Sequence, residues 1–355
     1  MIETITITDF RNHASDRIKT GGAKNIVITG PNGSGKTSVL EAISILSQSG
    51  SLRGAAPAEM IRIPDAVGFG VATTLADGSE ISMSFAAGDV KRRVRIDGDA
   101  APISDIGKHA RVLWLTPKED RLFADAPSER RAFFDRMCAS LDSAHGARIV
   151  RMGKLLHERA FALKNGSNDS WLNSIEHQLG ATAIAVAAAR VRYAGEINYF
   201  LKDSSYAVAV SGMLEERLGA GMSAADAERE YAEYLRANRE LIADKMNMDG
   251  PHRTDFGMIN GRLNMPVANT STGQQKSALL QLVMSNAKLV RARAGLPVFI
   301  LLDEVAAHLD AAARAALFVE LQATDAQIWM TGLEMESFAG IADAKFVYCE
   351  NGICV

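Results

Sequence analysis

A glycine-rich segment near the N-terminus has the composition of a phosphate-binding loop. It runs Gly30-Pro31-Asn32-Gly33-Ser34-Gly35-Lys36-Thr37-Ser38, with the glycine and lysine spacing of a P-loop. Glycine lets backbone N–H groups approach phosphate oxygens without a clash from Cβ, and a helix that starts near Lys36 adds the positive end of its dipole. We expect Lys36 to reach the β- and γ-phosphates and the Thr37 hydroxyl to bind Mg²⁺. A chance match in an ordinary turn is disfavoured, since a strand pattern precedes the loop and a helical pattern follows it.

Two adjacent acidic residues follow an apolar run in the second half of the chain. Residues 298–302 predict a strand buried on both faces, and Asp303 and Glu304 come directly after it. Asp303 is placed to order Mg²⁺, and Glu304 to orient or deprotonate an attacking water. A capping role for these acids fits poorly, because a cap lies directly before its helix and the next helix is predicted near Ala311. The catalytic candidates are therefore Glu304, Lys36 and Asp303.

A second polar loop opens a long predicted helix at Asn269-Thr270-Ser271-Thr272-Gly273-Gln274-Gln275-Lys276. A helix N-terminus of this composition can bind an anion, which makes Ser271, Gly273 and Gln274 candidate nucleotide contacts. An ordinary Ser/Thr N-cap is the alternative. Arg11 and Asn12, beside the first strand, are candidates for contacting phosphate or ribose, and a solvated loop is their alternative.

The elements that must position these residues alternate in type. Ile5 and Ile7 alternate with threonines, which predicts a half-buried strand, and residues 25–29 predict a second strand that leads into the P-loop. Asp77-Gly78 and Gly88-Asp89 separate short β-rich runs, as in an antiparallel meander. Residues 127–245 are rich in Ala, Leu, Arg and Glu and predict several helices. Further strands are expected at 111–115, 298–302, 327–330 and 345–348, and further helices at 274–293 and 311–321.

Composition restricts the classes of protein. The 355 residues are 47% hydrophobic with a formal net charge of −3, so nucleic acid binding requires a local basic surface rather than bulk charge. Neither a membrane-spanning apolar stretch nor a secretory signal is recognised, and the three cysteines are too few and scattered for a disulfide framework or a Cys-based zinc site, so a reducing cytoplasmic location is expected. Basic residues cluster at 91–95, 130–131, 148–154 and 190–192. Each cluster is either a phosphate contact or a solvated face. On a strand, Lys91, Arg93 and Arg95 would share one face.

The order of these motifs resembles that of the ABC-type ATPases, and among them the SMC-related heads of the RecF family of recombination and gap-repair proteins. The resemblance covers nearly the whole chain. It includes the segments Asp9-Phe10-Arg11-Asn12-His13, the P-loop, Leu40-Glu41-Ala42-Ile43, Ser51-Leu52-Arg53, Pro127-Ser128-Glu129-Arg130-Arg131-Ala132-Phe133-Phe134-Asp135, Gly250-Pro251-His252-Arg253-Thr254-Asp255, Ser271 to Lys276, and Ala307-His308-Leu309-Asp310.

The resemblance implies a fold and a way of working. The fold is an α/β ABC-type ATPase head (1–125 and 249–355) with an antiparallel β subdomain and an inserted helical lobe (126–248). Two heads would enclose ATP and Mg²⁺, with the P-loop of one facing the Ser271–Gly273 loop of the other. The ATP-dependent homodimer would bind duplex DNA near gaps and single–double-strand junctions, share junction recognition with a RecR-like mediator, help load recombinase on single-stranded DNA, and show weak DNA-stimulated ATPase activity.

Two departures from the ABC pattern predict slow hydrolysis. Residues 114–117 offer no glutamine for a glutamine loop, and Thr331-Gly332 stand where many ABC enzymes place a histidine. A small-molecule P-loop kinase or nucleotidase is the alternative function, and the Ser-Thr-Gly-Gln-Gln loop argues against it. A subunit of a membrane-transport ATPase is disfavoured by the missing glutamine and histidine and by the helical insertion.

Overall fold

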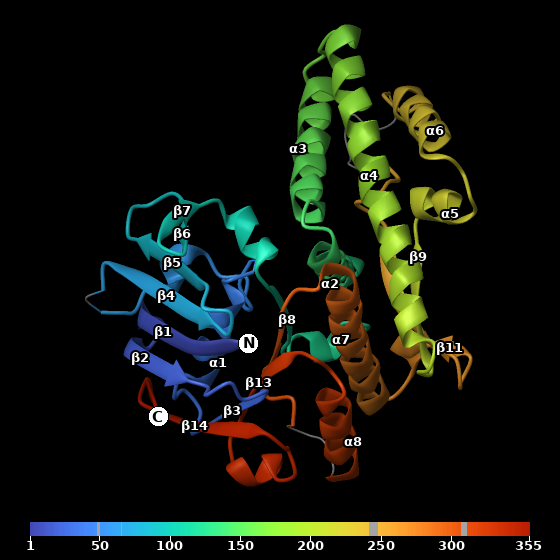
Figure 1. Ribbon diagram of the computed structural model, residues 1–355. Helices are drawn as coiled ribbons and strands as arrows, with labels where there is room; N and C mark the ends of the chain where they lie inside the picture. The colour runs from blue at the N-terminus through green and yellow to red at the C-terminus, as the bar shows by residue number, and fades with distance from the viewer. Residues whose placement is uncertain (48–49, 65, 241–247, 307–310) are drawn as a thin grey trace. The chain divides into compact units, whose positions relative to one another are not determined.

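The computed structural model describes residues 1–47, 50–64, 66–240, 248–306 and 311–355 (Figure 1). The chain forms two compact units, Met1–Arg121 with Leu279–Val355, and Leu122–Ala278. The two ends of the chain build one unit and its middle builds the other. The units change over at 121/122 and 278/279. The domain boundaries at 125/126 and 248/249 stay a prediction.

The first unit contains a mostly parallel sheet with strand order β15-β14-β3-β13-β12-β8. Only the pairing of β14 with β15 is antiparallel. Every residue of β3 and β12 is buried, as expected for continuous apolar runs in a sheet covered on both faces. The strands are β3 (Asn25–Thr29), β8 (Arg111–Leu115), β12 (Val298–Leu302), β13 (Gln327–Gly332), β14 (Ala344–Glu350) and β15 (Ile353–Cys354).

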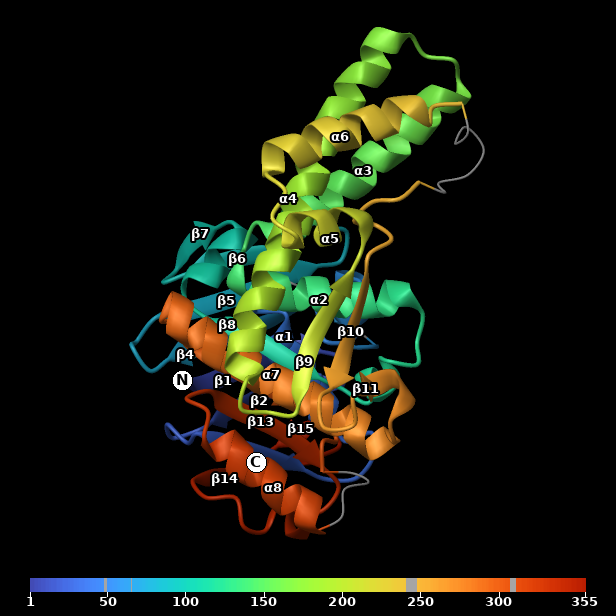
Figure 2. The ribbon, with the colours of Figure 1, turned by 90° about the vertical axis from the view of Figure 1, so that its right-hand side faces the viewer.

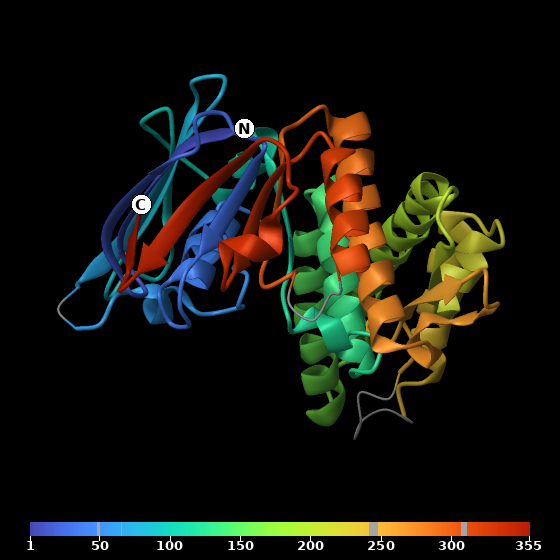
Figure 3. The same cartoon turned by 90° about the horizontal axis from the view of Figure 1, so that it is seen from below.

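A second, antiparallel sheet in the same unit has the order β2-β1-β4-β5-β6-β7. Ile5, Ile7 and the alternate residues of the meander face a hydrophobic core, while the threonines of β1 face outward. Helix α1 (Lys36–Ser44) packs against β1 of this sheet and against β8 and β13 of the parallel sheet, so one core joins both sheets (Figure 3). The strands are β1 (Ile2–Phe10), β2 (His13–Lys19), β4 (Gly68–Leu75), β5 (Glu80–Ala86), β6 (Arg93–Ile96) and β7 (Asp99–Ala101).

The second unit is built on a long helix, α4 (Asp169–Leu201), along which α3 (His145–Lys164) and α6 (Ala224–Ala237) pack (Figure 2). The side chains of Asn168 and Ser223 cap α4 and α6 by accepting hydrogen bonds from backbone N–H groups of their first turns. The unit also holds α2 (Pro127–Leu141), α5 (Met213–Gly219) and a small sheet of β9 (Tyr206–Ser211), β10 (Asp255–Asn260) and β11 (Met265–Pro266).

The remaining helices are α7 (Thr272–Ala294), which runs from the second unit into the first, and α8 (Ala311–Gln322) of the first unit. Short 3₁₀ turns are η1 (Pro57–Met60), η2 (Ile103–Lys108), η3 (Glu119–Arg121), η4 (Val267–Asn269) and η5 (Met335–Phe338).

Three features differ from expectation or were missed. Strand β2 was missed because its buried positions include His13 and Asp16 rather than apolar residues only. Strand β9 lies inside the stretch expected to be helical. The three cysteines were expected to form no disulfide framework, but Cys349 and Cys354 are joined by one disulfide. A two-residue turn places them opposite each other on β14 and β15. The predicted turn at Leu309-Asp310 lies outside the described residues.

Candidate functional site

Three neighbouring parallel strands bring the predicted catalytic residues to one edge of a sheet. Strand β13 pairs with β3 on one side and with β12 on the other. The P-loop follows β3, Asp303 and Glu304 follow β12, and Thr331 lies at the end of β13 between them. The carboxyl ends of parallel strands are where open α/β sheets bind ligands, so the strand order builds the candidate site.

The backbone of the P-loop is shaped to receive phosphate. Gly30, Gly33 and Gly35 have φ values of 144°, 80° and 112°, which side chains with a Cβ rarely tolerate. The Ser34 hydroxyl is buried and has no hydrogen-bond partner among the residues that the structure describes. Glycine-permitted N–H donors and an unpaired buried hydroxyl fit a phosphate ligand.

The Lys36 side chain lies folded over this loop. Its Nζ donates hydrogen bonds to the carbonyls of Gly30 (2.7 Å) and Pro31 (2.8 Å). Burial lowers the pKa of Lys36, while the charges of Glu304 and Asp303 oppose that shift. A lysine held near carbonyl oxygens and two carboxylates can exchange these contacts for phosphate oxygens, because it remains a donor with a flexible stem.

The two residues predicted to bind Mg²⁺ are in direct contact. Thr37 Oγ1 donates to Asp303 Oδ1 at 2.9 Å, and Thr331 Oγ1 donates to the same oxygen at 2.7 Å. Two hydroxyls and a carboxylate at a phosphate-binding loop are oxygen donors of the kind that Mg²⁺ takes, usually with several waters retained. This donor set fits the predicted ion. When bound, Mg²⁺ neutralises charge on the phosphate oxygens.

Thr331 also fixes the backbone of the predicted base. The N–H of Glu304 donates to Thr331 Oγ1 at 2.8 Å, and Glu304 itself has a positive φ of 50°. One hydroxyl therefore touches both acids. We did not predict a role for Thr331, and the available signal was its position directly after an apolar run in the place of the ABC histidine.

The guanidinium of Arg11 has a structural partner. It binds both carboxylate oxygens of the fully buried Glu41 at 2.8 Å and donates to the Glu59 carbonyl at 2.7 Å. The hydrogen bond with Glu41 raises the pKa of Arg11. Asn12 is exposed, and its amide lies 3.4 Å from the Gly33 carbonyl. Nucleotide contacts by Arg11 and Asn12 stay predictions.

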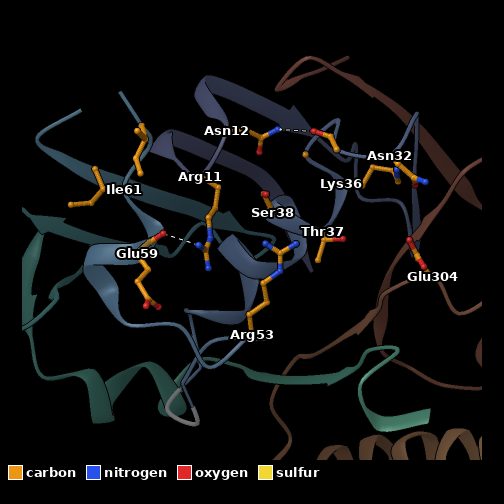
Figure 4. Close-up of a pocket in the computed structure, with 13 residues that line it drawn as sticks. Arg11, Asn12, Asn32, Lys36, Thr37, Ser38, Arg53, Glu59, Ile61 and Glu304 are labelled. Carbon is orange, nitrogen blue, oxygen red and sulfur yellow. Dashed lines mark hydrogen bonds between the residues drawn. The ribbon is translucent and has the colours of Figure 1, made fainter. Parts of the chain in front are cut away.

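Arg11, Asn12, residues of the P-loop and Glu304 line a cavity of about 430 Å³ on the first unit, within the usual range of small-molecule sites (Figure 4). Its walls come from the β1–β2 turn, the P-loop, the region around η1, and Glu304. Arg53 also faces it with a side chain that is 46% exposed and lies 3.6 Å from Glu41. It is a further cation available to a ligand, and it lies in Ser51-Leu52-Arg53, one of the segments in which the sequence resembles the RecF family. The lining residues include Arg11, Asn12, Asn32, Gly33, Gly35, Lys36, Thr37, Ser38, Arg53 and Glu304.

The Ser271 loop opens α7 with the bonds of a capping box. Ser271 N–H donates to Gln274 Oε1, and Gln274 N–H donates to Ser271 Oγ. Ser271, Gly273 and Gln274 are nonetheless exposed, and a Cβ added at Gly273 would meet no atom of the described residues within 4 Å. The loop belongs to the second unit and the P-loop to the first. It is thus both an N-cap and an open surface, and its role toward nucleotide stays a prediction.

Residues at the end of β8, where a glutamine loop is absent, are engaged with one another. The backbone N–H and the hydroxyl of Thr116 both donate to Glu119 Oε2, and the Leu115 carbonyl accepts from Asp303 N–H. This segment therefore supports the backbone of Asp303.

Two arginines of the basic clusters, Arg190 and Arg130, have structural partners. Arg190 is 1% exposed and binds Asp135 and Glu215, so it is not available to a DNA phosphate. Arg130 forms a bidentate pair with Asp255. In the 91–95 cluster, Arg93 and Arg95 are exposed on one face of β6 while Val94 is buried on the other, as strand alternation predicts, and Lys91 precedes the strand. Arg93 also pairs with Asp89 at 2.8 Å, with a side chain that is 69% exposed.

The family model for the RecF/RecN/SMC N terminal domain matches residues 1–354. The chain belongs to this family. The DNA replication and repair protein RecF of Brucella suis biovar 1 (strain 1330) is 38% identical over 99% of this chain and 95% of its own length. The RecF protein of Allorhizobium ampelinum (strain ATCC BAA-846 / DSM 112012 / S4) is 36% identical over 99% of this chain and 97% of its own. The resemblance to RecF is therefore confirmed.

Solved structures share the fold of this RecF-family chain. The recombination mediator protein RecF with ATP, in the RecFOR pathway, has a TM-score of 0.84 at 20% identity, covering 100% of this chain and 98% of that one. An SMC head bound to the C-winged helix domain of ScpA has a TM-score of 0.56 at 14% identity, with 99% and 95% covered. The predicted ABC-type head fold is confirmed. In the described part of the chain, no helix has both the length and the apolar character needed to cross a membrane.

Proposed function

We propose that this protein is an ATP-dependent DNA-binding protein of replication-gap and recombinational repair, in which ATP joins two copies of the chain. The observation that carries this is the meeting of Lys36, Thr37 and Asp303 beside Glu304 in one site, on a fold shared with an ATP complex of a RecF protein. The exposed Ser271 loop supplies the second half of the proposed site, on the other copy.

The proposed chemistry is a slow hydrolysis. Lys36 and the P-loop N–H groups bind the phosphates, Thr37 and Asp303 would hold Mg²⁺, and Glu304 orients or deprotonates the attacking water. Loss of the γ-phosphate removes an anion that two cationic helix ends share, which weakens the contact between the copies. The nucleotide thus acts as a ligand that favours the dimer.

The proposed DNA surface is the outer face of the antiparallel sheet. Two rows of paired residues cross it, Arg17–Thr6–Ala72–Ser82–Arg95 and Ser15–Thr8–Gly70–Ser84–Arg93. Small side chains leave the middle open, and basic side chains on β2 and β6 stand about 19 Å apart at the strand spacing of a sheet. Such a face is suited to the backbones of a duplex rather than to its base edges, so binding would be largely independent of sequence.

The remaining elements of the proposal are what we expect of a member of this family. They are duplex DNA at gaps and single–double-strand junctions, a RecR-like mediator, DNA stimulation of a weak ATPase, and a cytoplasmic location. The small-molecule kinase or nucleotidase is not favoured, because such an enzyme does not need an exposed loop, like that at Ser271, that faces the nucleotide of a second subunit.

Size-exclusion chromatography with light scattering tests the proposal. The wild-type chain should be monomeric without nucleotide and dimeric with ATP and Mg²⁺, and E304Q should hold the dimer longer. K36M should bind no nucleotide, whereas S271R should bind ATP as a monomer but form no dimer. A wild-type chain that binds ATP tightly and stays monomeric, or dimers that persist in S271R, would overturn the composite site.

A further inference from the structure

The P-loop is in contact with two other segments, the β14–β15 hairpin and strand β2. The hairpin joins β14 to β15, and a disulfide links Cys349 to Cys354 across it. Its turn residue Gly352 donates its N–H to the Ser34 carbonyl at 3.1 Å. A Cβ on Gly352 would overlap the Asn12 carbonyl, and one on Gly30 would overlap the Cys349 carbonyl. The hairpin and the phosphate loop are therefore in backbone contact.

A buried histidine makes the second connection. His13 is fully buried, and its Nε2 lies 3.1 Å from the carbonyl oxygen of Gly35, the last glycine of the loop. Its Nδ1 is hydrogen-bonded to Asp16 Oδ2, and Asp16 Oδ1 accepts the Cys354 N–H at 3.0 Å. Because a carbonyl oxygen can only accept, the Nε2–H of His13 is the donor to Gly35.

These contacts hold two successive peptide groups. In a trans peptide the C=O and the following N–H lie in one plane and point in opposite directions. Holding the Ser34 oxygen therefore orients the Gly35 N–H, and holding the Gly35 oxygen orients the Lys36 N–H. Backbone N–H groups of this loop are the donors that cradle phosphates in a P-loop.

We propose that His13 and Asp16, with the Cys349–Cys354 hairpin, are positioning elements of the nucleotide site that aim the Gly35 and Lys36 N–H groups. The inference rests on the proposed nucleotide site. His13, Asp16 and Cys354 offer ligand atoms within 4.8 Å of one another, the grouping of a metal site. Positioning is the better assignment, because both ring nitrogens of His13 already have hydrogen-bond partners in the protein.

Replacing His13 by glutamine or by asparagine tests its two hydrogen bonds one at a time. Glutamine places a donor near the position of Nε2, so H13Q keeps the bond to Gly35. Asparagine places one near Nδ1, so H13N keeps only the bond to Asp16. With a fluorescent ATP analogue, we expect H13N to bind about tenfold more weakly than wild type, and H13Q to stay within about threefold, since one hydrogen bond amounts to roughly a factor of ten.

The control is I18A, which truncates a buried residue of the same strand. It should lower the melting temperature without nucleotide and leave both nucleotide affinity and the ATP-induced rise in melting temperature unchanged. H13N should instead lose most of that rise, which a merely structural role would not affect. Wild-type affinity in H13N, or equal losses in H13N, H13Q and I18A, would overturn the inference.

Asp16 gives a second test if H13N does not fold. D16N can accept from Cys354 and donate to Nδ1, so its affinity should stay near that of wild type, whereas D16A should bind about tenfold more weakly. Wild-type affinity in D16A would overturn the inference. If wild type itself binds no nucleotide, the proposed function fails, which is a different result from either failure of positioning.

Discussion

At the scale of single residues, the acids of the site depend on one threonine. Glu304 has a positive φ, a region that non-glycine residues seldom occupy and that persists only where the surroundings stabilise it. The Thr331 hydroxyl accepts the Glu304 N–H and donates to Asp303. Thr331 is therefore a positioning residue for both acids.

We predict that T331V slows ATP hydrolysis and changes nucleotide affinity little. Valine keeps the shape of threonine but cannot bond Asp303 or Glu304. A lost hydrogen bond to a charged group amounts to about 1.5–3 kcal/mol, or roughly a tenfold to hundredfold lower single-turnover rate. The control T331S keeps the hydroxyl and should restore the rate. A T331V rate equal to that of wild type would contradict the assignment.

At the scale of elements, a buried ionic network joins helices of the second unit. Arg190 of α4 binds Asp135 of α2 at 2.8 Å and Glu215 of α5 at 3.0 Å, and it donates to the Pro251 carbonyl at 2.6 Å. Arg130 of α2 binds Asp255 at the start of β10. These ion pairs and hydrogen bonds join segments 127–135 and 250–255, two of the segments in which the sequence resembles the RecF family. Both segments therefore have a structural role.

We predict that R190M lowers the free energy of unfolding by about 3–5 kcal/mol, because it leaves two carboxylates buried without their cation. R190K retains the charge but not the planar guanidinium, so its free energy of unfolding should fall by less than that of R190M. Urea titration of the full-length chain measures both. A loss in R190M no larger than that of an exposed-site variant would show that the network contributes little.

The same network predicts a pH dependence. Burial alone would raise the pKa of Asp135, but hydrogen bonds from His145 and Arg190 outweigh it and hold that pKa below its ordinary value. The lower folded-state pKa stabilises the protein above the ordinary Asp value near 4, and this stabilisation is lost as pH falls through the lowered pKa. The unfolding free energy of D135N should therefore depend less steeply on pH below about 4 than that of wild type. If the unfolding free energies of D135N and wild type had the same slope against pH, Asp135 would not contribute to the pH dependence.

At the scale of the whole molecule, both proposed binding events use surfaces that a single chain leaves open. The Ser271 loop is exposed although its backbone is capped, and the outer face of the antiparallel sheet carries small side chains between basic edges. Binding of nucleotide between two copies would cover the first, and DNA phosphates would cover the second.

We predict that R93E/R95E weakens duplex binding equally for all sequences and reduces its salt dependence. Each lost phosphate contact reduces the magnitude of the slope of log affinity against log salt by about 0.9. The slope of the double variant should therefore be smaller in magnitude by about 2 than that of wild type. Fluorescence anisotropy at several salt concentrations measures this. R229E/R236E, at two exposed positions of α6 in the other unit, makes the same change of charge and is the matched control. An unchanged slope in R93E/R95E would remove the sheet face from the DNA surface.

Much of the fold was readable because its signals are local. The strands at 25–29, 111–115 and 298–302 have the bounds expected from their apolar runs, and the P-loop follows its strand as predicted. Strand β2 was hidden because polar side chains occupy buried positions, which they can do only because His13 and Asp16 bond each other. Strand β9 was hidden by its alanine-rich surroundings.

The sequence by itself determined which residues could carry phosphate and acid chemistry, since glycine backbone freedom and side-chain charge are properties of the residues. Tertiary structure alone decided that Thr37 would meet Asp303, that the Thr331 hydroxyl would contact both acids, and that Arg11 would bind Glu41. Thr37 and Asp303 are 266 positions apart in the chain, and the order of strands in the sheet, not their spacing in the sequence, brings them together.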